Sequence, residues 1–308
     1  MEHHNVVIIG GGPAGLAAAT RLHELGIKDI VVLEREAEAG GVPRHCGHFG
    51  FGWESHKRLM NGPKFSAKLC QAAHSVDVRT ATTVLEFTLR GNLRVHSHKG
   101  IADMSANRIL LATGTRESSR ASRLIGGQRL SGVMNTGTLQ QMVYLKSQKP
   151  FERPVIVGSE WVSFSALLTC RHAKINPVCI MTEKTKIDAP WFFKLGAKAG
   201  FGVGVKTQTK LLAIHGKIQV ESVEVERGNK TEMIACDGVI ISGQFRSESA
   251  LYAGGFLECD GDGPQMNGFK TSQQNIFAVG NVMGDLKTAG ACVVQARLAA
   301  EAMAKDLV

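Results

Sequence analysis

The glycine-rich turn near the N-terminus constrains this chain more than any other feature. Residues 5–19 read NVVIIGGGPAGLAAA, an apolar run followed by Gly10, Gly12 and Gly15 at the G-x-G-x-x-G spacing and then by small residues. In such a turn the first glycine makes the tight bend, the second lets the backbone approach a pyrophosphate, and the third lets the helix pack on the strand. The pattern predicts a strand, a turn and a helix whose N-terminus holds phosphate groups.

A second apolar run supports this interpretation. The run DIVVLERE at residues 29–36 follows the predicted helix and contains Glu34, about 20 residues past the glycines, where an adenosine ribose needs an acidic residue. A glycine-rich turn in an ordinary α/β protein is the alternative. The order of strand, turn, helix, strand and acid favours dinucleotide binding.

Composition narrows the classes of protein that remain. The 308 residues, 44% of them apolar and 35 of them glycine, suit two α/β domains. No apolar run approaches the roughly 18 residues that a membrane span needs, and the first strand begins by Val6, so we expect a cytoplasmic protein without a signal peptide. Attachment at the inner membrane through a partner is the alternative.

Charge and cysteine content exclude further classes. The net charge is +9, but the basic residues are scattered and only two tyrosines are present for stacking, so we expect no binding of nucleic acid. The basic balance instead suits anionic cofactors or an acidic partner. Seven cysteines without any C-x-x-C pair favour reduced thiols over a disulfide framework or a zinc site.

A second strand–turn–helix–strand unit is predicted after a β-meander. Turn signals at residues 91–92 and 99–100 divide the segment from residue 76 into a meander that ends on a buried strand at 108–115. The second unit begins with VIVGSEWVS at 155–163. Further strands are expected at 203–225, 237–245 and 276–281, before a closing helix from residue 289.

The turn of the second unit departs from the phosphate-binding pattern. Gly158 keeps the first position, but Glu160 stands at the second glycine position and Ser163 at the third. A carboxylate would repel a pyrophosphate in a partly desolvated site, so NAD(P)H binding there is doubtful, and Glu183 retains only the ribose part of the motif. We favour a Rossmann-like domain kept as a scaffold or subunit interface, in which Trp161 suits burial against a partner.

The order of these motifs resembles a known family. GGGPAG, LLATGT at 110–115, the second turn and IFAVGN at 276–281 are similar to the flavoprotein pyridine-nucleotide reductases with two dinucleotide-binding domains. GGVPRHCGHFGFG at 40–52, NGPKFSAKL at 61–69 and VSFSALLTCRHA at 162–173 look like the small FAD/NAD(P)-type subunits of hetero-oligomeric opine, sarcosine, proline and hydroxyproline dehydrogenases.

The resemblance implies an α/β fold of two Rossmann-like, three-layer ββα domains, the second inserted in the first. The FAD-binding domain would comprise residues 1–116 plus 245–308, and the NAD(P)-binding-like domain, which we expect to be degenerate, residues 117–244. The resemblance also implies FAD as cofactor. The cofactor-binding positions carried over from the family are Gly10, Gly12, Pro13, Ala14, Gly15, Glu34, Arg35, Ala112, Thr113, Gly114, Gly280, Asn281, Ala289 and Gly290.

Three of these positions carry specific expectations. Asn281 stands where these reductases usually have aspartate, and its amide can still hydrogen-bond a ribityl hydroxyl group. The closing helix, which starts near Ala289 and Gly290, would direct its N-terminal dipole at the pyrimidine edge of the flavin.

The residues that would perform chemistry are not identified by any motif. Relatives with a redox disulfide in the N-terminal segment place its cysteines after Gly40-Gly41, but only Cys46 follows here. The loop around it and the segment before the closing helix offer Arg44, Cys46, His48 and Lys287 as candidates, with an ordinary structural loop or surface lysine as the alternative. The spacing of His45, Cys46 and His48 does not match a tetrahedral zinc site, so we expect no metal.

The sequence favours an FAD-dependent oxidoreductase without a redox-active disulfide. By resemblance it would be a subunit of an amine or amino-acid dehydrogenase that passes electrons between the flavin of a larger partner subunit and an acceptor. Two alternatives remain open at this point: a non-catalytic nucleotide-binding subunit, and a self-sufficient NAD(P)H-dependent flavin reductase.

Overall fold

The computed structural model describes residues 1–307, and the chain forms two compact units within this range. The first unit contains residues 1–44, 49–116 and those from 246 onward, and the second contains residues 45–48 and 117–245. The grouping differs from the expected boundaries mainly in residues 45–48, which belong to the second unit. Cys46 and His48 therefore belong to a different unit from Arg44.

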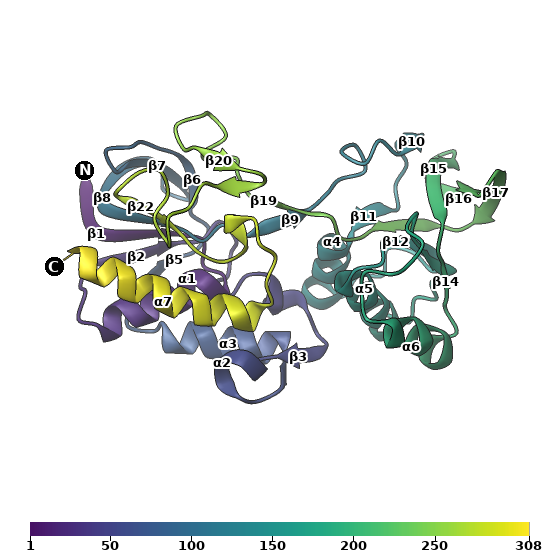
Figure 1. Ribbon diagram of the computed structural model, residues 1–308, viewed down its shortest axis with the longest axis horizontal. Coiled ribbons are helices and arrows are strands. Elements are labelled where there is room, and N and C mark those ends of the chain that lie inside the picture. Colours follow the sequence, from purple (N-terminus) through teal and green to yellow (C-terminus); the bar gives the residue numbers. More distant parts are fainter. Residues whose placement is uncertain (308) are drawn as a thin grey trace. The chain divides into compact units, whose positions relative to one another are not determined.

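A mostly parallel sheet forms the centre of the first unit (Figure 1). The strand order is β5-β2-β1-β8-β7-β6, and β22 pairs with the C-terminal end of β8. The strands β5, β2, β1, β8 and β22 run parallel, whereas β7 and β6 form an antiparallel meander with the first half of β8. The bounds are β1 (Glu2–Ile9), β2 (Ile30–Leu33), β5 (Asp77–Arg79), β6 (Thr83–Phe87), β7 (Asn92–Ser97), β8 (Gly100–Leu111) and β22 (Ile276–Ala278).

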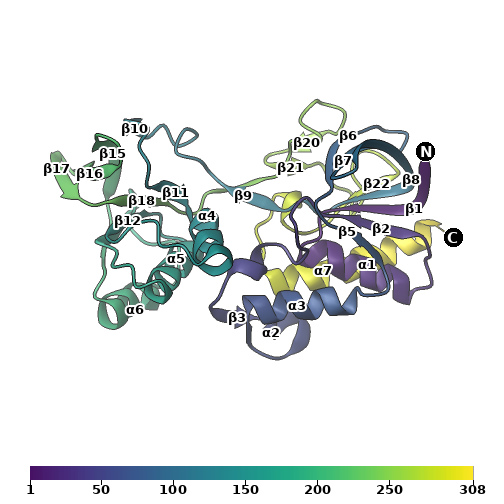
Figure 2. The ribbon, with the colours of Figure 1, turned by 180° about the vertical axis from the view of Figure 1, so that it is seen from behind.

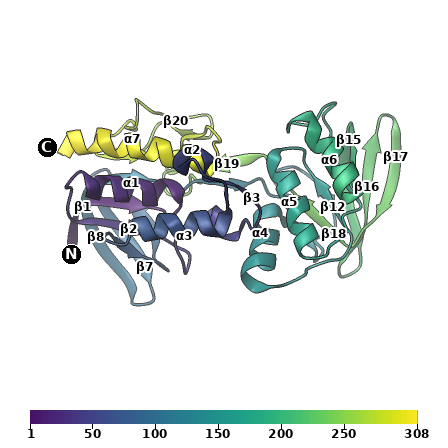
Figure 3. The same ribbon diagram turned by 90° about the horizontal axis from the view of Figure 1, so that it is seen from below.

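Helices cover one face of this sheet and the meander covers the other. The helices α1 (Pro13–Glu24), α3 (Gly62–Ala72) and α7 (Ala289–Leu307) lie side by side against the sheet (Figures 1 and 3). Successive side chains of β1 point to opposite faces, so Val6 and Ile8 join the helix-side core while Val7 and Ile9 pack against the meander. The arrangement is the expected three-layer ββα sandwich.

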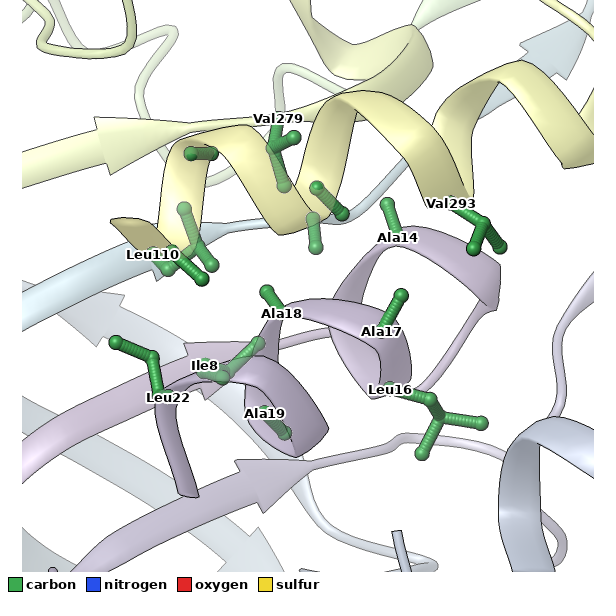
Figure 4. Close-up of a cluster of buried hydrophobic side chains, with 14 of the residues drawn as sticks. Ile8, Ala14, Leu16, Ala17, Ala18, Ala19, Leu22, Leu110, Val279 and Val293 are labelled. Carbon is green, nitrogen blue, oxygen red and sulfur yellow. The ribbon is translucent and has the colours of Figure 1, made fainter. Parts of the chain in front are cut away.

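Small residues bring α1 close to α7. Ala14, Ala17 and Ala18 of α1 lie toward Val293 of α7, and together with Ile8 they form part of one buried apolar cluster (Figure 4). Alanine favours the helix and leaves room for a second helix to approach. The first turn of α1 is thereby held rigidly at the C-terminal end of β1, where the glycine turn lies.

Short elements complete the first unit. They are η1 (Val42–His45), whose last residue belongs to the second unit, β3 (Phe49–Phe51), α2 (Trp53–His56), β4 (Met60–Asn61), β20 (Cys259–Asp260), β21 (Gly263–Pro264) and η3 (Gly280–Met283). The start of α3 is capped by Asn61, whose side chain accepts a hydrogen bond from the backbone N–H of Lys64 at 3.0 Å. The strands β9 (Thr115–Glu117) and β19 (Phe245–Ser247) pair with each other where the chain passes between the units.

The second unit repeats the layered plan. Its parallel sheet has the order β11-β18-β12-β13-β14, with helices on one face and a second, mainly antiparallel sheet, β10-β15-β16-β17, on the other (Figure 2). The bounds are β10 (Gly126–Gly127), β11 (Val133–Asn135), α4 (Thr136–Gln140), η2 (Gln141–Leu145), β12 (Pro154–Val157), α5 (Trp161–His172), β13 (Cys179–Met181), α6 (Trp191–Phe201), β14 (Gly204–Lys206), β15 (Thr209–Gly216), β16 (Val220–Arg227), β17 (Lys230–Ala235) and β18 (Gly238–Ile241).

The expected α/β fold of two Rossmann-like ββα units is confirmed. In both units the apolar runs of the sequence form the parallel strands, and the glycine turns lie between a strand and a helix, after β1 and after β12. None of the helices in residues 1–307 combines the length and the apolar character needed to cross a membrane.

Candidate functional site

The turn after β1 is held in place by contacts within the chain. Gly10 has a φ of +110°, and its N–H donates to the carbonyl oxygen of Leu33 at 2.8 Å. A Cβ atom on Gly10 would lie 2.5 Å from the carbonyl oxygen of Ala112, and a Cβ atom on Gly15 would collide with the carbonyl oxygen of Gly10. The first and third glycines are therefore required by the packing of the unit itself.

Gly12 differs from both. Its φ of −80° is open to any residue, and a Cβ atom there would meet only the Cα atom of Gly41, at 3.8 Å. Gly12 is the N-cap of α1, and within residues 1–307 no side chain accepts a hydrogen bond at this cap. The protein therefore leaves open space where a side chain of residue 12 would lie. This space is beside the free N–H groups at the N-terminus of α1. Such an arrangement is a cradle that can hold a phosphate group.

Glu34 is held beside this cradle. One carboxylate oxygen accepts from the N–H of Gly11 and the other from the N–H of Glu36, each at 2.8 Å, and the side chain is buried. Each oxygen retains an acceptor position for the hydroxyl group of a ribose. Arg35 lies next to it with an exposed side chain, 3.8 Å from the carboxylate of Glu248.

The glycine pair after β2 closes the cradle on one side. The N–H of Gly40 donates to the carbonyl oxygen of Gly11 at 2.7 Å. A Cβ atom on Gly41 would lie 2.8 Å from the Cα atom of Gly12, so this loop packs directly on the turn after β1. The sequence identified this Gly-Gly pair only as a marker for missing cysteines. Its packing role follows from two positive φ values, of +118° and +62°, which sequence alone does not show.

The predicted segment after β8 lies beside the same turn. The N–H of Ala112 donates to the carbonyl oxygen of Ile9 at 2.9 Å, and Thr113 donates through its hydroxyl group to the carbonyl oxygen of Glu248 at 3.2 Å. Gly114 has a φ of +73° and open space around it. Ala112 thus packs directly against Gly10.

The end of β22 positions Gly280 and Asn281. A Cβ atom on Gly280 would approach the Cβ atom of Ala14 to 3.0 Å, so this residue borders the first turn of α1. The side chain of Asn281 donates to the carbonyl oxygen of Lys287 at 3.1 Å and accepts from the N–H of the same residue at 2.7 Å. An aspartate could not donate to that carbonyl, which explains why asparagine suits this position.

The start of α7 has a neighbour that the sequence did not predict. Thr288 caps the helix by accepting from the N–H of Ala291 at 3.1 Å, and its hydroxyl group donates to the carboxylate of Glu54 at 2.6 Å. A Cβ atom on Gly290 would collide with the same carboxylate. The helix dipole stabilises this anion, so Glu54 of α2 holds the helix end that the resemblance assigned to a flavin. Glu54 lies 234 residues from Thr288 in the chain, and no local pattern indicated the pairing.

The structure divides the candidate catalytic side chains between the units. Arg44 and Lys287 belong to the first unit, where Arg44 lies 3.2 Å from Glu38 and Lys287 lies 3.5 Å from Asp285. Cys46 and His48 belong to the second unit.

Cys46 and His48 each contact a side chain of the second unit. The thiol of Cys46 donates to the side-chain oxygen of Gln140 at 3.3 Å, and His48 Nε2 lies 2.7 Å from the hydroxyl oxygen of Ser165. Burial raises the pKa of Cys46 to about 12, so its thiol is neutral and a poor nucleophile.

The turn after β12 repeats the backbone of the first turn. The N–H of Gly158 donates to the carbonyl oxygen of Met181 at 2.8 Å, as the N–H of Gly10 does to Leu33. A Cβ atom on Gly158 would collide with the carbonyl oxygen of Ser242, the counterpart of Ala112. The two turns are therefore equivalent position by position.

A carboxylate fills the second turn at the position equivalent to Gly12. One carboxylate oxygen of Glu160 accepts from the N–H of Gln244 at 2.7 Å. The carboxylate also lies 2.5 Å from the place that a Cβ atom of Gly243 would take. Glu160 thus joins the helix start to the loop after β18 and closes the space that Gly12 leaves open.

The strand register also corrects the expected ribose acid. The N–H of Thr182 donates to the carbonyl oxygen of Lys206 at 3.0 Å, as the N–H of Glu34 does to Arg79 at 2.9 Å. Thr182, and not Glu183, therefore occupies the position of Glu34, and the expectation that Glu183 keeps the ribose part of the motif is wrong. Glu183 is exposed one residue farther along the chain.

Buried charges fix the loop that receives Glu160. The carboxylate of Glu117 accepts from the N–H groups of Gly137 at 2.8 Å and Gly243 at 3.0 Å. Burial raises the pKa of this carboxyl group. Arg123 donates to the carbonyl oxygens of Ser242 and Gly243, and burial lowers the pKa of its guanidinium group although nearby carboxylates oppose the shift. The loop after β18 is thus held from both sides.

Comparisons with known proteins agree with this geometry. The family model described as pyridine nucleotide-disulphide oxidoreductase matches residues 4–302. The chain is 25% identical to the dihydrolipoyl dehydrogenase of Manduca sexta over 324 residues, which cover 91% of this chain and 63% of that protein. It is 22% identical to the sarcosine oxidase subunit alpha of Rhizobium meliloti (strain 1021) over 258 residues, 79% of this chain and 24% of that protein.

A solved structure shows the same fold. The thioredoxin reductase of T. acidophilum superimposes with a TM-score of 0.82 at 18% sequence identity, covering 99% of each chain. Members of the matched family use FAD, and NAD(P) takes part in homologues. The matched region of the dihydrolipoyl dehydrogenase is 63% of its length, so this chain corresponds to less than two thirds of that relative. The chain belongs to the pyridine nucleotide-disulphide oxidoreductase family.

Proposed function

We propose that this chain is an FAD-dependent oxidoreductase subunit of an amine or amino-acid dehydrogenase, without a redox-active disulfide. It would pass electrons between the flavin of a larger partner subunit and an acceptor. The observation that carries the proposal is the contrast between the two turns. The first leaves room beside Gly12 for a cofactor, whereas the carboxylate of Glu160 closes the second.

The residues of the first unit fit FAD. The N-terminus of α1 with Gly12 would hold the pyrophosphate, and the carboxylate of Glu34 would accept hydrogen bonds from the ribose. The Nε atom of Arg44 supports the fit, because it is buried and has no hydrogen-bond partner among residues 1–307. A buried donor without an acceptor is costly, and an acceptor atom of the cofactor would satisfy it.

FAD, when bound, supplies the electron-accepting ring system. The contribution of the chain is to bind and orient this group and to exclude water from it. The buried helix α1 and the end of β8 provide a rigid base for that purpose, because Gly10, Ala112 and Ile9 are joined by packing and hydrogen bonds.

Two observations support a partner subunit. The sarcosine oxidase protein similar to this chain is itself named as a subunit. On α5 the side chain of Trp161 is exposed, with its ring 5.0 Å from that of Phe193 between centroids. An exposed tryptophan on a packed aromatic base is typical of the centre of a protein interface. We propose a cytoplasmic location, in which a partner subunit can also bring the chain to the inner membrane.

Flavin absorbance of the purified protein tests which compounds reduce and reoxidise the cofactor. We expect the purified protein to be yellow, and its flavin absorbance to bleach with dithionite but not with NADH or NADPH at submillimolar concentration. A small artificial acceptor should reoxidise the reduced flavin. Rapid bleaching by NADH would support a self-sufficient reductase instead, and a colourless protein that retains ATP or NAD would support a non-catalytic nucleotide-binding subunit.

A further inference from the structure

Helix α6 of the second unit buries a small part of its apolar surface. Phe193, Ala197 and Phe201 recur every four residues and pack toward the helix-side core of the unit. Of the eleven residues in this helix, only Ala197 is fully buried. The rest of an apolar sequence, WFFKLGAKAGF, is therefore presented outward.

Large apolar side chains form that outward face. Trp191 is 76% exposed, Phe192 is 53% exposed and Leu195 is 60% exposed. Trp191 and Leu195 are four residues apart, on the side of the helix away from the buried stripe. A helix of a water-soluble domain normally has polar side chains on this side. Exposed apolar side chains here therefore indicate a surface that binds a protein or a membrane.

Two lysines accompany the apolar residues, and no acid does. Lys194 and Lys198 lie one turn apart on the same helix and are exposed. Residues 191–201 contain neither aspartate nor glutamate. The outward face of α6, defined here as Trp191, Phe192, Lys194, Leu195 and Lys198, is thus both apolar and positively charged.

We propose that the outward face of α6 binds the surface of a bilayer that contains anionic phospholipids. Tryptophan, phenylalanine and leucine enter the boundary between headgroups and acyl chains, and lysines pair with the headgroups. Each lysine near such a surface strengthens binding about fivefold. The helix lies at the interface and does not span the membrane, which agrees with the absence of a spanning helix in residues 1–307.

Two other occupants suit this face less well. The centres of protein interfaces are enriched in aromatic residues and arginine but depleted of lysine, whereas the cations here are both lysines. A twofold contact of this face with a second copy of the chain would bring four lysines together, and α6 supplies no acid to pair with them. A lipid surface is the occupant that accommodates both lysines together with the apolar side chains.

Vesicle binding tests the proposal on the full, FAD-loaded chain. Phosphatidylcholine vesicles with and without about 30% phosphatidylglycerol are sedimented with the protein at low and high salt. The phosphatidylglycerol gives the vesicles a negative surface potential. We expect binding to the anionic vesicles only, weakening as salt rises. The double substitution Lys194→Glu with Lys198→Glu should lower the partition coefficient at least about tenfold, and Trp191→Ala with Leu195→Ala about tenfold.

Matched controls come from other exposed positions. Trp53 is 60% exposed in the first unit, so Trp53→Ala removes a comparable tryptophan from another surface. Lys217→Glu with Ile218→Ala changes one exposed lysine and one exposed apolar residue in the second unit. Neither control should change vesicle binding, and circular dichroism should show that all variants fold.

Fluorescence quenching is a second test, and it leaves all residues of the outward face of α6 unchanged. With Trp53→Phe and Trp161→Phe, Trp191 remains the only tryptophan, and brominated anionic lipids should quench its fluorescence. The proposal is overturned if the unmodified chain does not bind anionic vesicles, if the controls lose binding as much as the α6 variants do, or if bound Trp191 is not quenched. It is equally overturned if the α6 substitutions abolish self-association or retention of a partner protein while vesicle binding persists.

Discussion

The turns after β1 and after β12 share a backbone but differ in what they can accept. In both, the first glycine donates its N–H to the neighbouring strand and faces a carbonyl oxygen from the next, so Gly10 and Gly158 are both required by packing. At the second glycine position, packing within the unit does not require a glycine. Gly12 leaves room there, whereas Glu160 places a carboxylate that hydrogen-bonds within its own unit.

A retained first glycine therefore says little about ligand binding. Gly158 would be kept whether or not a nucleotide binds, because a side chain would collide with Ser242. The informative residues are those that the protein itself does not need. Gly12 meets this description in the first unit, and its counterpart in the second unit is Glu160.

The largest expected effect concerns the glycine that packs helix on strand. Gly15→Ala forces a Cβ atom into the carbonyl oxygen of Gly10, so we expect a loss of about 3 kcal/mol in the free energy of unfolding. Urea unfolding followed by circular dichroism measures it. Gly200→Ala is the matched control, because that helical glycine has open space, and it should be neutral or slightly stabilising. Equal stability of both variants would show that the third glycine serves the cofactor alone.

The second effect separates cofactor binding from folding. A Cβ atom at Gly12 makes only an ordinary contact, with the Cα atom of Gly41 at 3.8 Å, so Gly12→Val should change the free energy of unfolding of the apoprotein by no more than about 1 kcal/mol. FAD affinity should fall about 100-fold, because the side chain occupies the phosphate position. The ratio of flavin to protein absorbance reports the loss. Glu34→Ala should weaken FAD binding less, by about tenfold, since the cradle stays intact. A stoichiometric FAD content in Gly12→Val would contradict the proposed pyrophosphate position.

The third effect is a gain in the second unit. Glu160→Gly with Trp161→Ala opens the turn, and adding Thr182→Glu supplies the missing ribose acid. We expect NADH affinity, measured by calorimetry, to rise about tenfold over the unmodified chain. Glu160→Gln is the comparison that removes the charge and keeps the size. If it gains as much affinity as Glu160→Gly, repulsion and not lack of space closes the turn. Submillimolar NADH binding by the unmodified chain would overturn the idea.

The smallest effect is expected from thiol modification. Burial raises the pKa of Cys46 to about 12 and that of Cys292 to about 11, so both remain neutral thiols below about pH 10. Iodoacetamide at pH 8 should therefore label the exposed Cys259 first, as mass spectrometry would show. Flavin reduction by dithionite and reoxidation should be unchanged by the label. A large change would indicate that a thiol takes part in electron transfer.

Local patterns identified residues that lie around the first turn because these residues are close in the chain. Gly10, Gly12, Gly15 and Glu34 lie within one strand–turn–helix–strand unit, and the structure places them around one turn. The register of β13 was predicted less well. Thr182 and Glu183 are neighbours, and only the hydrogen bond from Thr182 to Lys206 shows which of them matches Glu34.

Long-range contacts set the rest of the site, and no local pattern reports them. The carboxylate of Glu54 reaches the start of α7, and Asn281 is matched to the backbone of Lys287. Cys46 and His48, close to Arg44 in the chain, belong to the other unit.

The two Rossmann-like units and the family could be predicted from the sequence alone, as could the two glycine turns. These follow from apolar periodicity and from glycines whose backbone angles or packing exclude side chains. The tertiary structure decided what each turn can hold. Whether Gly12 opens a cradle and Glu160 closes one depends on atoms of Gly41 and Gln244, brought from other strands and loops, and on the space that remains between them.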